Sequence, residues 1–323
     1  MSSSSDVVNY SLRQNKSIER SLVFDGARTL IDRLGLTDFV YVGLGSVWFA
    51  DFHLAHRHLR TGTMVSIEAD PVTYTRAVFN KPYRTVDVRP GLSSAVIPGL
   101  LKEPELQGRP WMVWLDYDQS VGEDELVELA DLVGGLPPDS LLLTTFSATA
   151  GRYGNKPVSR PQRLRDLFGA AAPPASPGGQ EDDLSLYSSE ALPGVLAESM
   201  QRHLRSKALQ KGRPGGYLPA FQLIYRDGTP MVTVGGFLAS PGRQAAAAAV
   251  VADADWACLV RRTIDTPLLT QKETQKLQEQ LPVATGRLTR AQVNRLGFDL
   301  EQDALDSFQD HYLRFPTFSQ LMR

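Results

Sequence analysis

The 323-residue sequence is long enough to bury a large core, and it predicts one large domain or two smaller ones. Its 42% hydrophobic and 22% charged residues are typical of globular proteins, and a net charge of −2 gives no overall basic character of the kind that marks nucleic-acid-binding proteins. A single cysteine, Cys258, excludes a disulfide framework and a cysteine-based zinc site. Because the chain has no membrane-length apolar run and no signal-peptide pattern, we expect a soluble, cytoplasmic protein.

The first predicted element is a helix over residues 10–34, which follows a polar leader at residues 1–9. Its apolar residues recur at helical spacing, and its early part carries the polar residues Asn15, Lys16 and Arg20. Two interpretations of these three side chains are open. They form a solvated face on a helix that leads into the sheet, or they belong to a lid that brings hydrogen-bond donors over a cofactor or substrate.

Residues 39–70 predict a strand, a glycine turn, a helix and a second strand that ends at Glu68. Glycines at the carboxyl end of a strand allow a ligand to approach the backbone closely, and an acid at the end of the next strand can accept both ribose hydroxyls. This is the first βαβ unit of a nucleoside-binding α/β fold. The residues that we expect to bind the cofactor here are Gly43, Leu44, Gly45, Ser46, Glu68 and Ala69.

The residue at the third position of the glycine pattern decides which nucleoside is favoured. A dinucleotide-binding turn needs a third glycine there, beside the pyrophosphate, but this sequence has Trp48. Nicotinamide and flavin dinucleotides, and with them a dehydrogenase, are therefore disfavoured. S-adenosylmethionine has no pyrophosphate and tolerates a looser turn, so it is the predicted cofactor. Asp51, in the following helix, is a further candidate for binding its methionine amino group.

A third strand is predicted over residues 83–88, and the turn Gly91-Leu92-Ser93 follows it. In methyltransferase-like folds a turn of this form passes beside the adenine ring. We therefore expect Leu92 to lie against the ring and Ser93 to lie near its edge.

The fourth predicted strand, residues 111–116, is almost entirely apolar and leads into Asp116-Tyr117-Asp118. Alternate residues of an extended segment share a face, so both carboxylates could point at one substrate or metal. We expect Asp116 and Asp118 to position or deprotonate the nucleophile, with Tyr117 as an orienting partner. Residues 147–149, after the fifth strand, contain no carboxylate to complete a divalent-ion site, so no metal is predicted.

Residues 147–215 form a segment longer than an ordinary crossover connection, and we expect a cap or specificity element there. It contains basic residues at 152–165 and 202–213, a low-complexity linker at 170–179 and a helix from about residue 189 to 210. The basic residues either lie on solvated helix faces or line a groove for an acidic partner such as RNA. A hairpin with its turn at Asp227-Gly228 then closes the sheet, and helices follow in the tail.

Several segments, in this order, resemble a bacterial O-methyltransferase family. They are residues 10–20, 41–52, 66–70, 76–82, 114–118 and 312–318, and they span most of the chain. The family is related to class I S-adenosylmethionine-dependent methyltransferases. The resemblance implies this fold and this cofactor more than it implies a substrate. It also strengthens the lid interpretation, in which Asn15 and Arg20 contact the cofactor and Lys16 has a catalytic role.

These observations predict a Rossmann-like class I methyltransferase sheet, with a parallel core closed by an antiparallel hairpin. The expected parts are an N-terminal leader and helix (1–34), an α/β domain (35–240) with the cap insertion (147–215), and a helical extension (241–323). The predicted function is methylation of an acceptor, a small molecule or RNA, on oxygen in preference to nitrogen. The alternative is a non-catalytic nucleoside-binding module that uses the basic cap to hold a nucleic-acid or protein partner.

Overall fold

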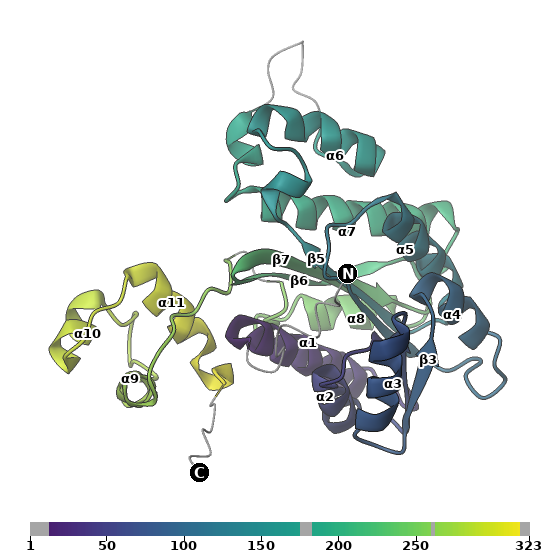
Figure 1. Cartoon of the computed structure of the whole chain (residues 1–323), viewed down its shortest axis with the longest axis horizontal. Helices are drawn as coiled ribbons and strands as arrows, with labels where there is room; N and C mark the ends of the chain where they lie inside the picture. The colour runs from purple at the N-terminus through teal and green to yellow at the C-terminus, as the bar shows by residue number, and fades with distance from the viewer. Residues whose placement is uncertain (1–12, 175–182, 260–261, 317–323) are drawn as a thin grey trace.

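A seven-stranded sheet forms the centre of the computed structural model, which describes residues 13–174, 183–259 and 262–316 (Figure 1). The strand order is β3-β2-β1-β4-β5-β7-β6, and β7 runs antiparallel to both of its neighbours while the other pairs are parallel. The predicted fold class, a parallel core closed by an antiparallel hairpin, is therefore confirmed. The strands are β1 (Val40–Leu44), β2 (Thr63–Glu68), β3 (Val86–Pro90), β4 (Trp111–Asp116), β5 (Ser140–Ser147), β6 (Leu218–Asp227) and β7 (Thr229–Leu238).

Helices cover both faces of the sheet. One face carries α4, α5 and α7, and the other carries α1, α2, α3 and α8 (Figure 1). The helices are α1 (Gln14–Arg33), α2 (Ala50–Leu59), α3 (Pro71–Asn80), α4 (Ser93–Leu100), α5 (Glu123–Gly135), α6 (Arg160–Phe168), α7 (Leu192–Gln210), α8 (Gln244–Val251), α9 (Gln271–Gln278), α10 (Arg290–Leu296) and α11 (Gln302–His311).

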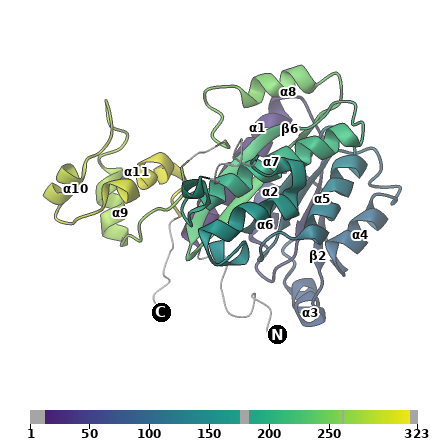
Figure 2. The same cartoon turned by 90° about the horizontal axis from the view of Figure 1, so that it is seen from above.

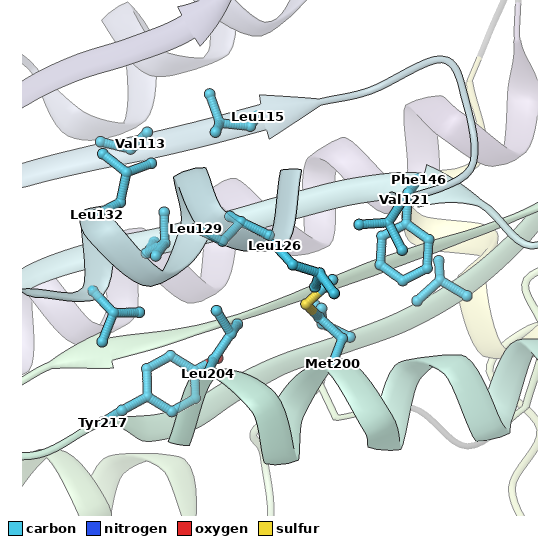
Figure 3. Packing of buried hydrophobic residues seen from close by; sticks show 14 of the residues in the cluster. Val113, Leu115, Val121, Leu126, Leu129, Leu132, Phe146, Met200, Leu204 and Tyr217 are labelled. Carbon is cyan, nitrogen blue, oxygen red and sulfur yellow. The ribbon is translucent and has the colours of Figure 1, made fainter. Parts of the chain in front are cut away.

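Strand β4 is apolar from Trp111 to Leu115 because both of its faces are buried. Successive side chains of a strand point to opposite faces, so Val113 and Leu115 join the core under α5 and α7 while Met112 and Trp114 join the core under α1. Figure 3 shows the first of these cores, where Leu129 of α5 and Met200 of α7 lie in the same layer. Both cores depend on β4, so the strand holds the two layers of helices together.

The predicted cap, residues 147–215, is divided by the structure into two parts. Helix α7 packs on β6, β7 and α5, and it contributes Leu196, Met200 and Leu204 to the core (Figure 3). It is the crossover helix between β5 and β6 and belongs to the sheet domain. The part before it, which includes α6, lies on the outer side of α7 (Figure 1). Only this preceding part is an addition to the sheet, because α7 is needed to bury one face of it.

Helix α1 packs against α2 and β6, with Ile18, Leu22 and Val23 fully buried. The polar residues of its first two turns are buried as well: Asn15 is 4% exposed, Lys16 is 2% exposed and Arg20 is 6% exposed. The interpretation of these residues as a solvated face is therefore wrong. Apolar spacing alone did not reveal their burial, because the carboxylates and carbonyl groups that surround them come from distant strands.

The C-terminal helices α9, α10 and α11 form a small unit with its own core, built around Leu277, Val293 and Phe308. This unit lies to one side of the sheet domain in both views (Figures 1 and 2). Its end returns to α1, where Arg314 pairs with Asp25 at 2.9 Å. Residues 241–323, predicted as a helical extension, contain α8 to α11; α8, packed on α1 and β6, was not predicted.

Four predicted features lie wholly or partly outside the described residues: the leader at 1–9, the start of the helix at 10–34 with its motif at 10–20, the second half of the linker at 170–179, and the end of the motif at 312–318. Within the described ranges, no helix is both long enough and apolar enough to cross a membrane.

Candidate active site

A cavity of about 1110 Å³ opens at the carboxyl ends of β1, β2 and β4 and continues between α4 and α5. This is the edge at which open α/β sheets bind ligands. Eleven of the fourteen predicted site residues line it: Arg20, Leu44, Gly45, Ser46, Glu68, Ala69, Leu92, Ser93, Asp116, Tyr117 and Asp118.

Gly45 forms the closest approach between the glycine turn and strand β2. Its N–H donates to the carbonyl of Ile67 at 2.6 Å, and a Cβ at this position would lie 2.8 Å from the Ser66 hydroxyl and 3.0 Å from the Ile67 carbonyl. A side chain there would push the turn away from β2. Glycine at position 45 therefore keeps Ser46 and Glu68 on the same wall of the cavity.

Gly43, which was predicted to contact the cofactor, has a different position. It lies within β1 and is not part of the cavity lining; a Cβ on it would come within 2.9 Å of the Tyr41 hydroxyl. Tyr41 is fully buried, and its side chain extends beneath the strand end. The absence of a side chain at Gly43 makes room for this tyrosine rather than for a ligand.

Glu68 ends β2 as the pattern predicts. One of its carboxylate oxygens accepts a hydrogen bond from the N–H of Asp70 at 3.0 Å, and partial burial raises the pKa of the side chain. Leu92 lines the cavity although it is 65% exposed, so it offers an apolar surface to a ligand. Ser93, the first residue of α4, lies beside it.

Asp116, at the end of β4, is 22% exposed and is held from behind by Lys16. The Lys16 ammonium lies 2.8 Å from Asp116 Oδ2 and 3.4 Å from Glu19 Oε2. Burial alone lowers the pKa of Lys16, but the two carboxylates together outweigh this effect and raise it. Lys16 was predicted to be catalytic in its own right. It lies outside the lining, so it can act only through Asp116.

Glu19 was not predicted, yet it belongs to the same buried network. Its Oε1 accepts a hydrogen bond from the Thr233 hydroxyl at 2.5 Å, and that hydroxyl lies 2.7 Å from the hydroxyl of Thr145. Thr145 in turn accepts from the indole N–H of Trp114 at 2.9 Å. These groups come from α1, β4, β5 and β7, so the network fixes the base of the site to three strands.

Arg20 and Asn15 have separate roles although both lie on α1. Arg20 lines the cavity and donates to Asp51 at the start of α2. Asn15 lies outside the lining. Its amide donates to the Arg226 carbonyl at 2.7 Å, and its amide oxygen accepts from Thr266. Asn15 therefore joins α1 to β6 and to the chain that leads into the tail, and both ends of its amide are engaged there.

Tyr117 turns toward α5, where its hydroxyl donates to Glu128 at 2.9 Å. Burial, together with the charge of Glu128, raises the pKa of Tyr117, so the phenol stays protonated. Asp118 is exposed at the mouth of the cavity. The two acids that were predicted to share one face therefore line different parts of the cavity, one at its base and one at its rim.

The wall between α4 and α5 was missed from the sequence. Its α4 side is apolar, with Ile97, Pro98 and Leu101, and its α5 side carries Asp124, Glu125, Glu128 and Asp131. Acids in the first turn of a helix, such as Glu123, Asp124 and Glu125, are an ordinary signal of a helix N-terminus. Positions 124, 128 and 131 share a helix face, and this spacing is the signal that could have identified them.

Two of the basic residues of 147–215 are bound to backbone carbonyl groups of the fold itself. Arg160 donates to the carbonyl of Gly154 at 3.0 Å, and Arg213 donates to the carbonyls of Val133 and Leu136, both at 2.8 Å. In the ranges that the structure describes, none of the residues from 147 to 215 lines the cavity. These two arginines stabilise the fold by satisfying backbone carbonyl groups.

The chain matches the model of the family described as "Putative O-methyltransferase" over residues 8–323. It belongs to this family. The match covers nearly the whole chain, so it includes the sheet domain and the C-terminal helices, and the predicted family and methyltransferase class are confirmed. No curated protein matches the sequence.

Among solved structures, the chain is similar to an O-methyltransferase from Bacillus cereus in complex with S-adenosylhomocysteine (13% identity; 72% of this chain and 94% of that chain; TM-score 0.38). It is also similar to TomG from Streptomyces achromogenes with S-adenosylmethionine (15% identity; 72% of this chain and 93% of that chain; TM-score 0.38). A third similar structure is Trm1 from Pyrococcus horikoshii with S-adenosylmethionine (11% identity; 71% of this chain and 57% of that chain; TM-score 0.42). The first of these structures contains S-adenosylhomocysteine and the other two contain S-adenosylmethionine.

A first testable consequence concerns the pH dependence of stability. Burial raises the pKa of Glu19 to about 7, from 4.5 in an exposed chain, although Lys16 opposes the shift. An acid whose pKa is higher in the folded state favours folding at low pH, and this contribution is lost as the pH rises through 7. Glu19→Gln does not titrate, so its stability relative to the unmodified protein should rise between pH 5 and pH 8 by about 2–3 kcal/mol.

Urea denaturation of both proteins across this pH range measures the difference. Other shifted groups are common to both proteins and cancel in the comparison. A difference in the free energy of unfolding that stays constant from pH 5 to pH 8 would show that Glu19 does not hold a proton in the folded protein.

Proposed function

We propose that this protein transfers the methyl group of S-adenosylmethionine to a hydroxyl group of a small molecule bound in the same cavity. The observation that carries the proposal is the joint lining of one cavity by Gly45, Glu68, Leu92 and Asp116, in a chain that belongs to an O-methyltransferase family. The bound cofactor would supply an electrophilic methyl group. The chain has to bind it, exclude water and hold the acceptor in line.

The residues of the cavity fit the cofactor. Glu68 has one carboxylate oxygen engaged by the Asp70 N–H, which leaves the other to accept from ribose hydroxyls. Leu92 offers an apolar contact for the adenine ring. The glycine turn lets the cofactor approach the backbone, and Asp51 and Arg20 supply opposite charges for the amino and carboxylate groups of the methionine part.

Asp116 is the proposed acceptor-orienting residue. The ion pair with Lys16 fixes its carboxylate at the base of the cavity, where it can accept a hydrogen bond from the acceptor hydroxyl. Such a bond orients the attacking oxygen and increases the electron density on it. A carboxylate of the cavity can then accept the hydroxyl proton as the methyl group is transferred. Asp118, at the rim, is proposed to contact the outer part of the acceptor.

The size and charge of the cavity favour a small acceptor over RNA. Its volume of about 1110 Å³ lies just above the range of roughly 300–1,000 Å³ typical of small-molecule sites, so it has room for more than the cofactor. The charged side chains of its walls are mostly carboxylates, which repel phosphate groups. The alternative is a binding module that uses a basic cap. Arg160 and Arg213 do not support it, because both donate to backbone carbonyl groups of the protein itself.

The test is calorimetric titration of S-adenosylmethionine into the protein and its Glu68→Ala variant. Hydrogen bonds to a charged group are worth about 1.5–3 kcal/mol, so the variant should bind roughly 10- to 100-fold more weakly. Glu105→Ala removes an exposed glutamate outside the lining and should bind normally. NAD should not bind any of the three. Folded protein that fails to bind S-adenosylmethionine would overturn the proposal.

A further inference from the structure

The cavity contains a large excess of negative charge. Of its described lining residues, a single one, Arg20, is a lysine or arginine, whereas eight carry carboxylates. These eight come from five places: the start of α2, the end of β2, the end of β4, the rim and the inner face of α5. They are Asp51, Glu68, Asp116, Asp118, Asp124, Glu125, Glu128 and Asp131.

Three of these carboxylates pair with a cation: Asp51 with Arg20 of the lining itself, and Asp116 and Asp131 with lysines outside the lining. Lys16 lies 2.8 Å from Asp116, and Lys211 lies 3.1 Å from Asp131. Lys16 is itself shared, because Glu19 lies 3.4 Å from the same ammonium on the side away from the cavity.

The carboxylates are spread through the cavity instead of converging on one point. In the described ranges, no group of three or more histidine, cysteine, aspartate or glutamate side chains is arranged to hold a metal ion. The excess charge thus acts on the whole enclosed volume. Low-dielectric walls of one sign focus the field inside a cleft, so a ligand there is selected by its charge as well as by its shape.

S-adenosylmethionine and its product differ in this respect. They share one skeleton, but the sulfonium gives S-adenosylmethionine one more positive charge than S-adenosylhomocysteine. Transfer of the methyl group to a hydroxyl breaks the carbon–sulfur bond and leaves its electron pair on sulfur, so the bound thioether is neutral while the hydroxyl proton passes to a base.

We propose that this cavity discriminates between cofactor and product by charge, binding the sulfonium form more tightly and releasing the neutral thioether, with Asp116 as a principal determinant. This inference rests on the proposed function, because it takes S-adenosylmethionine as the ligand. Its consequence is weak product inhibition, since the charge that favours entry of the cofactor is lost when the methyl group leaves.

The experiment measures the affinities of S-adenosylmethionine and S-adenosylhomocysteine by calorimetry, at about 20 mM and about 0.5 M salt. At low salt S-adenosylmethionine should bind about tenfold more tightly, and the ratio should fall at least about threefold at high salt because screening weakens the field. Sinefungin, which has an amine in place of the methylated sulfur, should behave like S-adenosylmethionine. This compound separates the effect of charge from that of the methyl group.

Two variants locate the effect. Asp116→Asn should lower the affinity ratio about threefold or more, and Asp118→Asn, an exposed change at the rim that does not threaten folding, should lower it by a smaller factor. The matched control is Asp303→Asn, since Asp303 is 98% exposed on α11 and outside the lining, and it should leave the ratio unchanged.

A product that binds as tightly as the cofactor at low salt would overturn the inference and leave the proposed function standing. So would a ratio that neither salt nor the two cavity variants change. If folded protein binds none of the three ligands, the proposed function fails first and the inference fails with it.

Discussion

Replacement of Lys16 by methionine is expected to lower the free energy of unfolding by about 3–5 kcal/mol. The Lys16 ammonium lies 3.4 Å from Glu19 and also pairs with Asp116 at 2.8 Å. It lies 4.9 Å from the ring centre of Trp114 and 5.1 Å from that of Tyr225. Methionine would fill the space but leave buried carboxylates without a counter-charge, which is the most costly way to break a buried ion pair.

Two comparisons make this result specific. Lys211→Met removes a lysine that pairs with Asp131 at 3.1 Å but is 45% exposed, and it should cost less than about 1 kcal/mol. The double variant Lys16→Met/Glu19→Gln should recover a large part of the loss, because it removes one of the uncompensated charges. Urea denaturation at pH 7.5 measures all three. Equal costs for the two lysine variants would contradict the view that Lys16 is a buried counter-ion.

Gly45→Ala is expected to weaken S-adenosylmethionine binding about 10- to 100-fold while the protein remains folded. The new methyl group would lie 2.8 Å from the Ser66 hydroxyl and 3.0 Å from the backbone carbonyl of Ile67. The serine hydroxyl can rotate away, but the carbonyl belongs to β2 and cannot. The turn must therefore move, and Ser46 and Glu68 lose their common position along the cavity wall.

The control for this change is Gly62→Ala, immediately before β2 at its opposite end. A Cβ at Gly62 meets no atom within 4 Å, so this variant should bind S-adenosylmethionine normally. Calorimetry gives the affinities, and circular dichroism verifies that both variants are folded. Unchanged affinity in Gly45→Ala would mean that the glycine turn does not support the cofactor.

The sequence alone was sufficient for most of the sheet and for one edge of the site. The apolar runs of β1, β2, β4 and β5 and the Asp227-Gly228 turn are local signals, and the structure places these strands where they predict. Glu68 and Asp116 were found because a residue that ends a parallel strand must lie at the ligand-binding edge. Their functional roles stay predictions until the binding experiments are done.

Only the tertiary structure decided the environment of α1. The partners of Lys16, Asn15 and Arg20 lie on α2, on β4, on the β6–β7 hairpin and at Thr266, 251 residues from Asn15, so helical spacing near residue 16 contains no information about them. The same holds for Glu19, whose hydroxyl partner Thr233 is 214 positions away. Desolvation and charge pairing are properties of the assembled core, and they turn an apparently polar helix face into the buried base of the site.

The division of the long segment after β5 was also a tertiary outcome. Its length and basic residues predicted a cap, but α7 is required to cover one face of the sheet, and Met200 and Leu204 are fully buried there. The acids of α5 show the opposite case. In the sequence they are an ordinary signal of a helix start, but in the structure they line the cavity opposite α4. Local sequence determined which segments are helices and strands. Packing between distant elements determined which of their polar faces are buried and which line the cavity, because burial depends on partners that periodicity does not encode.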